Sequence, residues 1–280
     1  MVGECPDESI GGPLNARRSH YRRNDGYGNY PLNGSEMIPY FPQPVWQFGP
    51  FTIHAFGVMA ALALLLWYWL VRSRAKRFQL TAERAGSVYL AVVAAALLGG
   101  FLWTGGAGVS GTGAAVGSMA AFLLTVPRGN GNQFWSFFDL LGFGLPFVLA
   151  FARFGCFLAH DHKGLPTTSW IGVQFPEGTR FDLGLLYCIS ALAAAVAVVL
   201  ADRTKVPAGV LSGTMLLLLG AGRLAVLPLA SPSAGDWIVA VMATAAGVAI
   251  VIGKSRQPVA HGSLDARSLI SKSGIHERTL

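Results

Sequence analysis

Charged residues are scarce in this 280-residue chain: they make up 12% of the sequence, against about 25% in an average soluble domain. Hydrophobic residues make up 52%, which excludes an intrinsically disordered protein. Three cysteines are too few for a disulfide scaffold. The chain also lacks the pattern of a secreted soluble enzyme, a single cleavable apolar segment followed by a polar body. The composition therefore predicts an all-α integral membrane protein.

The sequence contains long apolar runs that are typical of membrane-spanning helices. A helix needs about 20 residues to cross about 30 Å of hydrocarbon. Runs near that length predict a seven-transmembrane helix bundle, and they are 51–71, 87–106, 108–126, 134–158, 183–201, 207–228 and 236–253. The third run is the weakest candidate, because its small residues suit close helix packing better than contact with lipid. The glycines at 99–100 and 105–117 are interpreted as helix contact surfaces for the same reason.

Lysine and arginine are distributed unequally between the connections of these runs. One side has 13 of them and the other has 6. Because cytoplasmic loops are enriched in these residues, the N-terminus is predicted to lie outside and the C-terminus in the cytoplasm. The net charge of +7 therefore indicates membrane orientation and no nucleic acid partner, since the basic residues lie between apolar runs.

Polar segments flank the predicted bundle. Residues 1–40 are expected to form a polar N-terminal tail, residues 41–253 the transmembrane domain, and residues 254–280 a polar cytoplasmic tail. Met37 opens a more apolar stretch and is an alternative start of translation.

Arg153 and Arg223 are the two basic residues that lie inside apolar runs. An ionised group in hydrocarbon costs about 2.5–3.5 kcal/mol on insertion scales, so each arginine needs a partner or a function. Both lie about 7–8 Å from the predicted outer end of their helix. They either reach the outer headgroups and hold the bundle together, or bind a lipid phosphate through planar, bidentate donors. Because two arginines occur at one depth, lipid phosphate binding is favoured.

Other polar residues are predicted at the same level of the outer leaflet. His54 lies near the outer end of the first run, Thr112 near the start of the third, and His160, Asp161 and His162 directly after the fourth. The tripeptide is a solvated loop, a general base with an orienting carboxylate, or a metal site.

A metal ion is the weakest of these alternatives. Cys5, Cys156 and Cys188 lack the spacing of metal-ligand pairs, so the sequence predicts no metal and no cofactor. Cys156 and Cys188 are interpreted as small apolar fillers. Asp139 lies near the cytoplasmic end of the fourth run and is expected to cap or orient that end.

Three stretches resemble the prolipoprotein diacylglyceryl transferase family, over about residues 40–230. They are FGPFTIHAFGVM in the first run, FFDLLGFGLPFVLAFARFGCFLAHDHKG in the fourth and GAGRLAVLPL in the sixth. The residues of the second stretch that match the family pattern are Asp139, Pro146, Arg153, Gly155, Phe157 and Gly164. Arg223, in the third stretch, falls on the family's second essential arginine.

Several family positions are changed in this chain. The stretch GVSGTGAAVG has Thr112 where the family has a histidine, and Phe56 takes the place of a tyrosine. Cys156 and Asp161 stand where the family has asparagine and glutamate, and Leu227 replaces the acidic partner of the second arginine. The pattern predicts a divergent member.

The resemblance implies transfer of a diacylglyceryl group from phosphatidylglycerol to the lipobox cysteine of a prolipoprotein, in the bacterial plasma (inner) membrane. The implied partners are phosphatidylglycerol, the prolipoprotein signal segment and the lipid bilayer. The residues expected to bind phospholipid are Arg153, Arg223, Gly155 and Gly164. The residues expected to supply the missing base are His160, Asp161, His162 and His54. An inactive homologue that binds anionic phospholipid or a lipoprotein precursor, and a related transferase with another acceptor, remain alternatives.

Overall fold

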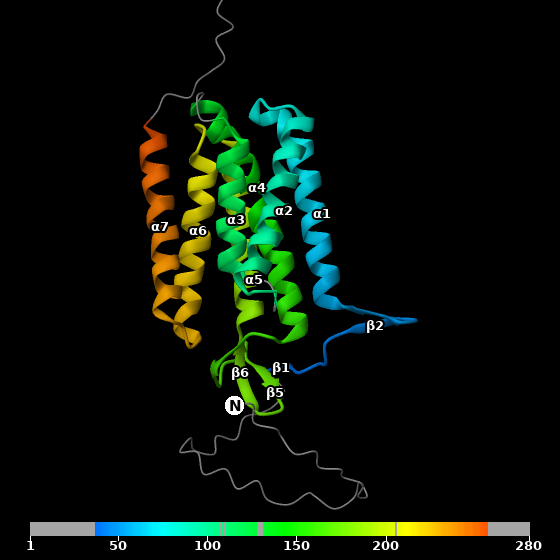
Figure 1. Cartoon of the computed structure of the whole chain (residues 1–280). Coiled ribbons are helices and arrows are strands. Elements are labelled where there is room, and N and C mark those ends of the chain that lie inside the picture. Colours follow the sequence, from blue (N-terminus) through cyan, green and yellow to red (C-terminus); the bar gives the residue numbers. More distant parts are fainter. Residues whose placement is uncertain (1–36, 107, 109, 128–130, 205, 257–280) are drawn as a thin grey trace, which may run out of the picture. The chain divides into compact units, whose positions relative to one another are not determined.

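The computed structural model describes residues 37–106, 108, 110–127, 131–204 and 206–256; most of both predicted tails lies outside these ranges. The described part is mostly helical (Figure 1). Its α-helices are α1 (Ala55–Arg74), α2 (Ala82–Trp103), α3 (Gly111–Thr125), α4 (Gly131–Ala159), α5 (Leu183–Arg203), α6 (Val210–Val226) and α7 (Ala234–Ser255). Two 3₁₀ turns, Ala75–Phe78 and Leu227–Leu229, extend α1 and α6.

Six of the described helices are long and apolar enough to cross a membrane. They correspond to six of the seven runs predicted from the sequence, and they indicate a multi-pass membrane protein. The exception is α3, the weakest candidate, which has 15 residues and is therefore about 22 Å long. That length is shorter than about 30 Å of hydrocarbon, so the seventh span stays a prediction.

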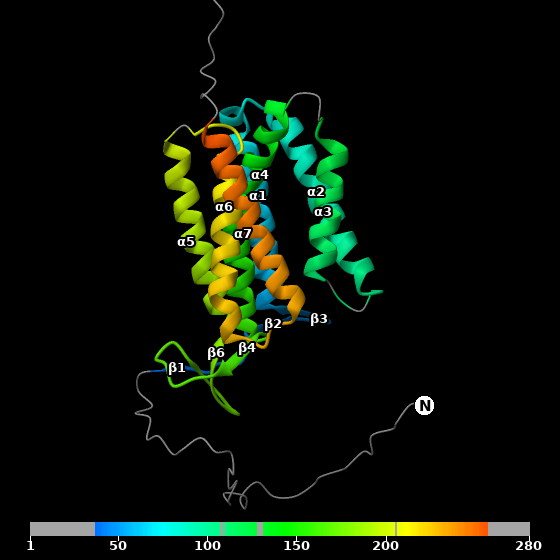
Figure 2. The same ribbon diagram turned by 90° about the vertical axis from the view of Figure 1, so that its left-hand side faces the viewer.

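Helix α4 is central to the bundle and packs against α1, α5 and α6 (Figures 1 and 2). Trp67 of α1 donates a hydrogen bond from Nε1 to the Leu141 carbonyl of α4, at 3.1 Å. Gly144 makes this close approach possible, because a Cβ there would lie 2.1 Å from Trp67 Cδ1. The buried carboxylate of Asp139 accepts hydrogen bonds from the backbone of Gly209 and Ser212, at 2.6 and 2.8 Å. Asp139 therefore caps the start of α6, and not the end of its own helix as predicted.

Gly99, Gly113 and Gly117 form a helix contact surface, as predicted. The prediction is wrong for Gly105, Gly108 and Gly111, where a Cβ would meet nothing within 4 Å. Figure 2 shows α2 and α3 side by side. A Cβ at Gly99 would lie 2.5 Å from the Gly113 carbonyl oxygen, and a Cβ at Gly117 would lie 2.1 Å from the Ala95 carbonyl oxygen. The two backbones approach this closely because small residues line both helices.

Short strands lie at the end of the bundle where α1 begins and α4 ends (Figure 1). The strands are β1 (Ile38–Pro39), β2 (Val45–Phe48), β3 (Phe51–His54), β4 (Lys163–Pro166), β5 (Val173–Phe175) and β6 (Gly178–Asp182). A four-stranded sheet has the order β1-β5-β6-β4, with β1 parallel to β5 and the other pairs antiparallel. Strands β2 and β3 form a separate hairpin.

The all-α prediction is wrong for this end of the bundle. The connection 159–182 contains three strands, which are too short to produce a clear alternating pattern. The predicted domain boundary at residue 41 is also wrong, because Ile38 and Pro39 pair with β5. Membrane helices are longer and more apolar, so their signal in the sequence is much stronger.

The predicted first run begins four residues too early. Residues 51–54 form strand β3, and α1 begins at Ala55. Gly49 and Pro50 connect β2 to β3, and Gly49 has a φ of +58°, a conformation that favours glycine in two-residue hairpins. Both strands of the hairpin are exposed along their length.

Candidate functional site

A pocket of about 520 Å³ opens where the β2–β3 hairpin and the start of α1 meet the end of α4. This volume lies within the range of about 300–1,000 Å³ that is usual for small-molecule sites. The lining residues are Gln43, Thr52, Ile53, His54, Phe56, Gly57, Ala159 and Asp161. His54 is exposed and Asp161 lies on the α4 side, so two of the predicted site residues share one pocket.

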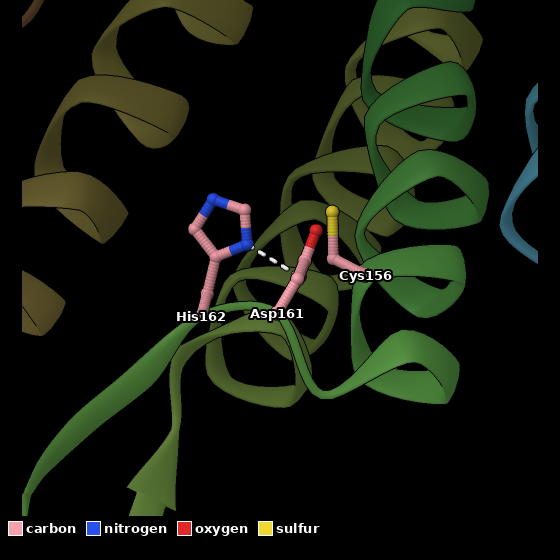
Figure 3. Close-up of side chains that lie close together, drawn as sticks. All are labelled: Cys156, Asp161 and His162. Atoms are coloured by element: carbon pink, nitrogen blue, oxygen red, sulfur yellow. Dashed lines mark hydrogen bonds and ion pairs between the residues drawn. The ribbon is translucent and has the colours of Figure 1, made fainter. Parts of the chain in front are cut away.

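The end of α4 brings a thiol, a carboxylate and an imidazole together (Figure 3). The donor atoms of Cys156, Asp161 and His162 all lie within 4.8 Å of one another. Cys156 is buried, whereas Asp161 and His162 are exposed. Nδ1 of His162 lies 2.5 Å from Oδ1 of Asp161. Because Asp161 also lines the pocket, this cluster adjoins it.

His160 occupies a different environment from its two neighbours in the tripeptide. Its side chain is buried, and Nδ1 lies 2.7 Å from Oδ2 of Asp182. Burial raises the pKa of Asp182, although the hydrogen bond with His160 lowers it in part. Four aromatic rings lie 4.5 to 5.3 Å from the imidazole, centroid to centroid, and they belong to Tyr40, Phe41, Phe157 and Phe175. The tripeptide is therefore not one exposed catalytic unit.

The backbone of His160 reverses the chain at the end of α4. Its φ of +50° is left-handed, which is uncommon for a residue with a side chain. The buried hydrogen bond between His160 and Asp182 holds this reversal in place. Asp182 also accepts a hydrogen bond from the Leu185 backbone at the start of α5. The reversal returns Asp161 and His162 towards Cys156.

Tyr187 of α5 interacts with both arginines of the predicted phosphate site. The guanidinium carbon of Arg153 is 4.9 Å from the centroid of the Tyr187 ring. Arg223 also interacts electrostatically with this tyrosine. Sequence reasoning missed Tyr187, although it lies one turn into α5, at the depth expected for the arginines. Among the described residues, arginines pair only with Asp202 and Asp236, so no carboxylate neutralises Arg153.

Arg223 has an acidic partner that the sequence did not suggest. Its Nη2 donates to Oδ1 of Asp236 at 2.6 Å. Asp236 belongs to the first turn of α7, where it forms a capping box with Ser233. Leu227, at the position where the family has the acidic residue, is buried. Asp236 therefore supplies from the next helix the negative charge that appeared to be lost.

Two glycines predicted to bind phospholipid make close packing contacts. A Cβ at Gly155 would lie 3.1 Å from the Met59 Cβ of α1. A Cβ at Gly164 would lie 2.6 Å from the Leu229 carbonyl oxygen. Both glycines therefore set the packing around the site, and their direct contact with phospholipid stays a prediction.

Thr112 is exposed near the start of α3. Helix α3 packs along α2, and no hydrogen bond joins Thr112 to the pocket or the cluster within the described ranges. The position that carries a histidine in the family therefore provides no acid or base here.

Comparisons with known proteins agree with the resemblance. The family model described as prolipoprotein diacylglyceryl transferase matches residues 43–252. A phosphatidylglycerol-prolipoprotein diacylglyceryl transferase of Bifidobacterium longum is 27% identical over 166 residues, which cover 50% of this chain and 52% of the relative. A protein of the same name from Francisella tularensis subsp. holarctica is 29% identical over 169 residues, which cover 51% of this chain and 61% of the relative. The chain thus spans about half to three fifths of the length of these curated relatives.

Proposed function

The chain belongs to the prolipoprotein diacylglyceryl transferase family, and on that premise we propose that it transfers a diacylglyceryl group from phosphatidylglycerol to the lipobox cysteine of a prolipoprotein. One observation carries this proposal: Arg153 and Arg223 both interact with Tyr187, and no carboxylate in the described part of the chain neutralises Arg153. A guanidinium without a carboxylate partner in an apolar helix suits a phosphate that arrives with the lipid.

The reaction requires attack by a thiolate on the glycerol carbon that bears the phosphate ester. The carbon–oxygen bond breaks, and glycerol phosphate leaves with its electron pair. Arg153 stabilises the charge that develops on this phosphate, because catalysis depends on interactions that strengthen as the bond breaks. Arg223, held by Asp236, contributes at the same depth.

The acceptor thiol must also lose its proton. Since the pKa of a free cysteine is about 8.5, few thiols are ionised at neutral pH. We assign this activation to His162, which Asp161 orients at the edge of the pocket. His54, on the other wall of the pocket, is the second candidate. We assign His160 a positioning role, because its buried ring pairs with Asp182.

We also propose that the protein lies in the plasma membrane of a bacterium and crosses it seven times. The N-terminus then lies outside and the C-terminus in the cytoplasm. The basic residues concentrated on one side of the bundle support this orientation. In this arrangement, Arg153, Arg223 and the pocket face the outer leaflet.

Cysteine labelling tests the orientation. With the native cysteines replaced, Ser73→Cys is expected to react with a membrane-impermeant reagent only after the membrane is permeabilised. Ser73 is exposed in the last turn of α1, so the thiol is accessible in the folded protein. Ser169→Cys, in the segment between β4 and β5, is the matched control and is expected to react in intact cells. Labelling of Ser73→Cys from outside would overturn the proposed orientation.

An in vitro assay tests the function itself. The purified full-length protein is incubated with phosphatidylglycerol and a synthetic lipobox peptide, and formation of the diacylglyceryl thioether is measured. Complementation of a bacterial strain depleted of its own transferase gives an independent measurement. Lipidated peptide and growth support the proposal.

A catalytically inactive homologue is the alternative that Thr112 and the other changed positions favour. It predicts phosphatidylglycerol binding without thioether formation. The pairing of Arg223 with Asp236 is compatible with both alternatives, because a charge in an apolar helix needs a partner with or without catalysis. Thioether formation in the assay decides between them.

A further inference from the structure

The reversal of the chain after α4 produces a cluster that contains ligands for a metal ion. The donor atoms of Cys156, Asp161 and His162 lie within 4.8 Å of one another (Figure 3). Thiolate, carboxylate and imidazole are the three side-chain types that bind zinc in proteins, and catalytic zinc sites use three protein ligands with a fourth position open. We propose that these three residues bind a zinc ion whose open position takes the acceptor thiol.

The geometry requires only small adjustments. Zinc–ligand distances of about 2.0–2.3 Å place tetrahedral donors about 3.5 Å apart. The side chains of Asp161 and His162 are 43% and 45% exposed, so they can rotate towards the buried sulfur of Cys156 without disturbing the core. The backbone of His160, fixed by its hydrogen bond with Asp182, already holds the two ligands close to the third.

The charges also suit a divalent cation. A thiolate and a carboxylate neutralise the two positive charges of the ion. The soft sulfur ligand and the imidazole favour zinc over magnesium or calcium, which prefer oxygen ligands. Arg153 interacts electrostatically with Cys156 and balances the negative charge that a fourth, incoming thiolate brings.

This inference deepens the proposed transfer reaction and rests on it for the role of the ion. An acceptor thiol that binds zinc loses its proton to water, because a coordinated thiol is deprotonated. With the ion bound, His162 therefore activates the thiol as a ligand of zinc and no longer as a free base. Its sulfur then forms the bond to the glycerol carbon, and the electron pair of the broken carbon–oxygen bond leaves with glycerol phosphate, next to Arg153. Asp161 lines the pocket, so the open position adjoins the space in which the substrates meet. Cys156 and Asp161, two departures from the family pattern, thereby replace the missing histidine.

Cobalt(II) is the probe for the site. The full-length protein in detergent is freed of metal with a chelator and titrated with cobalt. We expect binding of one equivalent with a sulfur-to-cobalt charge-transfer band, and displacement of the cobalt by zinc. Cys156→Ser should abolish the band, and His162→Ala should weaken cobalt binding by at least about 10-fold, the smallest loss usual even for outer-shell partners.

Matched controls separate this cluster from the other cysteines. Cys188→Ala, a buried thiol of α5 outside the cluster, and Cys5→Ser should both retain the band. Asp161→Asn provides a second variant should Cys156→Ser fail to fold, and it should also weaken cobalt binding. Absence of the band in the unmodified protein, or its survival in Cys156→Ser, would overturn the site.

The role of the ion is tested separately from the function. If the protein lipidates the peptide, removal of metal should slow transfer, and added zinc should restore it. Undiminished transfer after chelation would overturn the role of zinc in thiol activation while the transferase function stands. Cobalt binding without transfer from any phospholipid would instead support the metal site and contradict the proposed function.

Discussion

Arg153→Gln is expected to slow diacylglyceryl transfer by about 10²–10³, the usual cost of removing one donor that stabilises developing charge. Glutamine keeps polar atoms at the position but removes the positive charge beside Tyr187. Arg153→Lys should recover only part of the rate, because a lysine keeps the charge without the planar pair of donors. Transfer rates and phosphatidylglycerol binding are measured on the same detergent-purified preparations.

Arg84→Gln is the matched control for this experiment. Arg84 is an exposed arginine near the start of α2, where it donates to the Thr125 carbonyl at 2.8 Å, far along the bundle from the end of α4. Its replacement should leave transfer and lipid binding within about twofold of the unmodified protein, because exposed contacts of this kind contribute about 1 kcal/mol or less. Unchanged transfer and lipid binding in Arg153→Gln would assign Arg153 to headgroup anchoring instead.

His162→Ala should slow transfer by about 10²–10⁴, the usual range for loss of an acid–base group, and leave phosphatidylglycerol binding nearly unchanged. His162 is exposed beside Asp161 at the edge of the pocket, whereas the lipid phosphate is proposed to bind the two arginines. A rate defect without a binding defect therefore separates thiol activation from lipid capture. Full transfer by His162→Ala would move the activating group elsewhere, and His54→Ala is the next variant to measure.

His160→Gln gives the contrasting result and serves as the control for His162. Its main effect should be on stability, because it disturbs the buried hydrogen bond to Asp182, and an unsatisfied buried group costs about 1–3 kcal/mol. A lower melting temperature with residual transfer at low temperature is expected. A large loss of transfer with unchanged melting temperature would instead return His160 to the catalytic group.

Arg153, Arg223 and Asp139 show which features of the site can be predicted from the sequence. The sequence alone singled out Arg153 and Arg223, because a charge in an apolar run is costly wherever the helix packs. Asp139 was expected to cap the end of its own run, and it instead caps the start of α6. Such predictions depend on local composition and on the distance to the end of a run.

Contacts between side chains of different helices could not be predicted from the sequence in this way. Asp236 is 13 residues from Arg223 and on a different helix, and Tyr187 meets Arg153 only because α4 and α5 pack together. The strands that surround His160 contain two to five residues each, which is too short for a periodic signal.

The sequence by itself determined that the chain is a multi-pass membrane protein. It also determined where the long helices lie and which arginines they contain, because the transfer of apolar and charged groups into lipid dominates the free energy of each segment. Only the tertiary structure decided which of the three residues at 160–162 is buried. His160 is the buried one, because of its left-handed backbone conformation and its hydrogen bond with Asp182. The same turn gathered Cys156, Asp161 and His162, since a chain reversal brings together donors that linear spacing keeps apart.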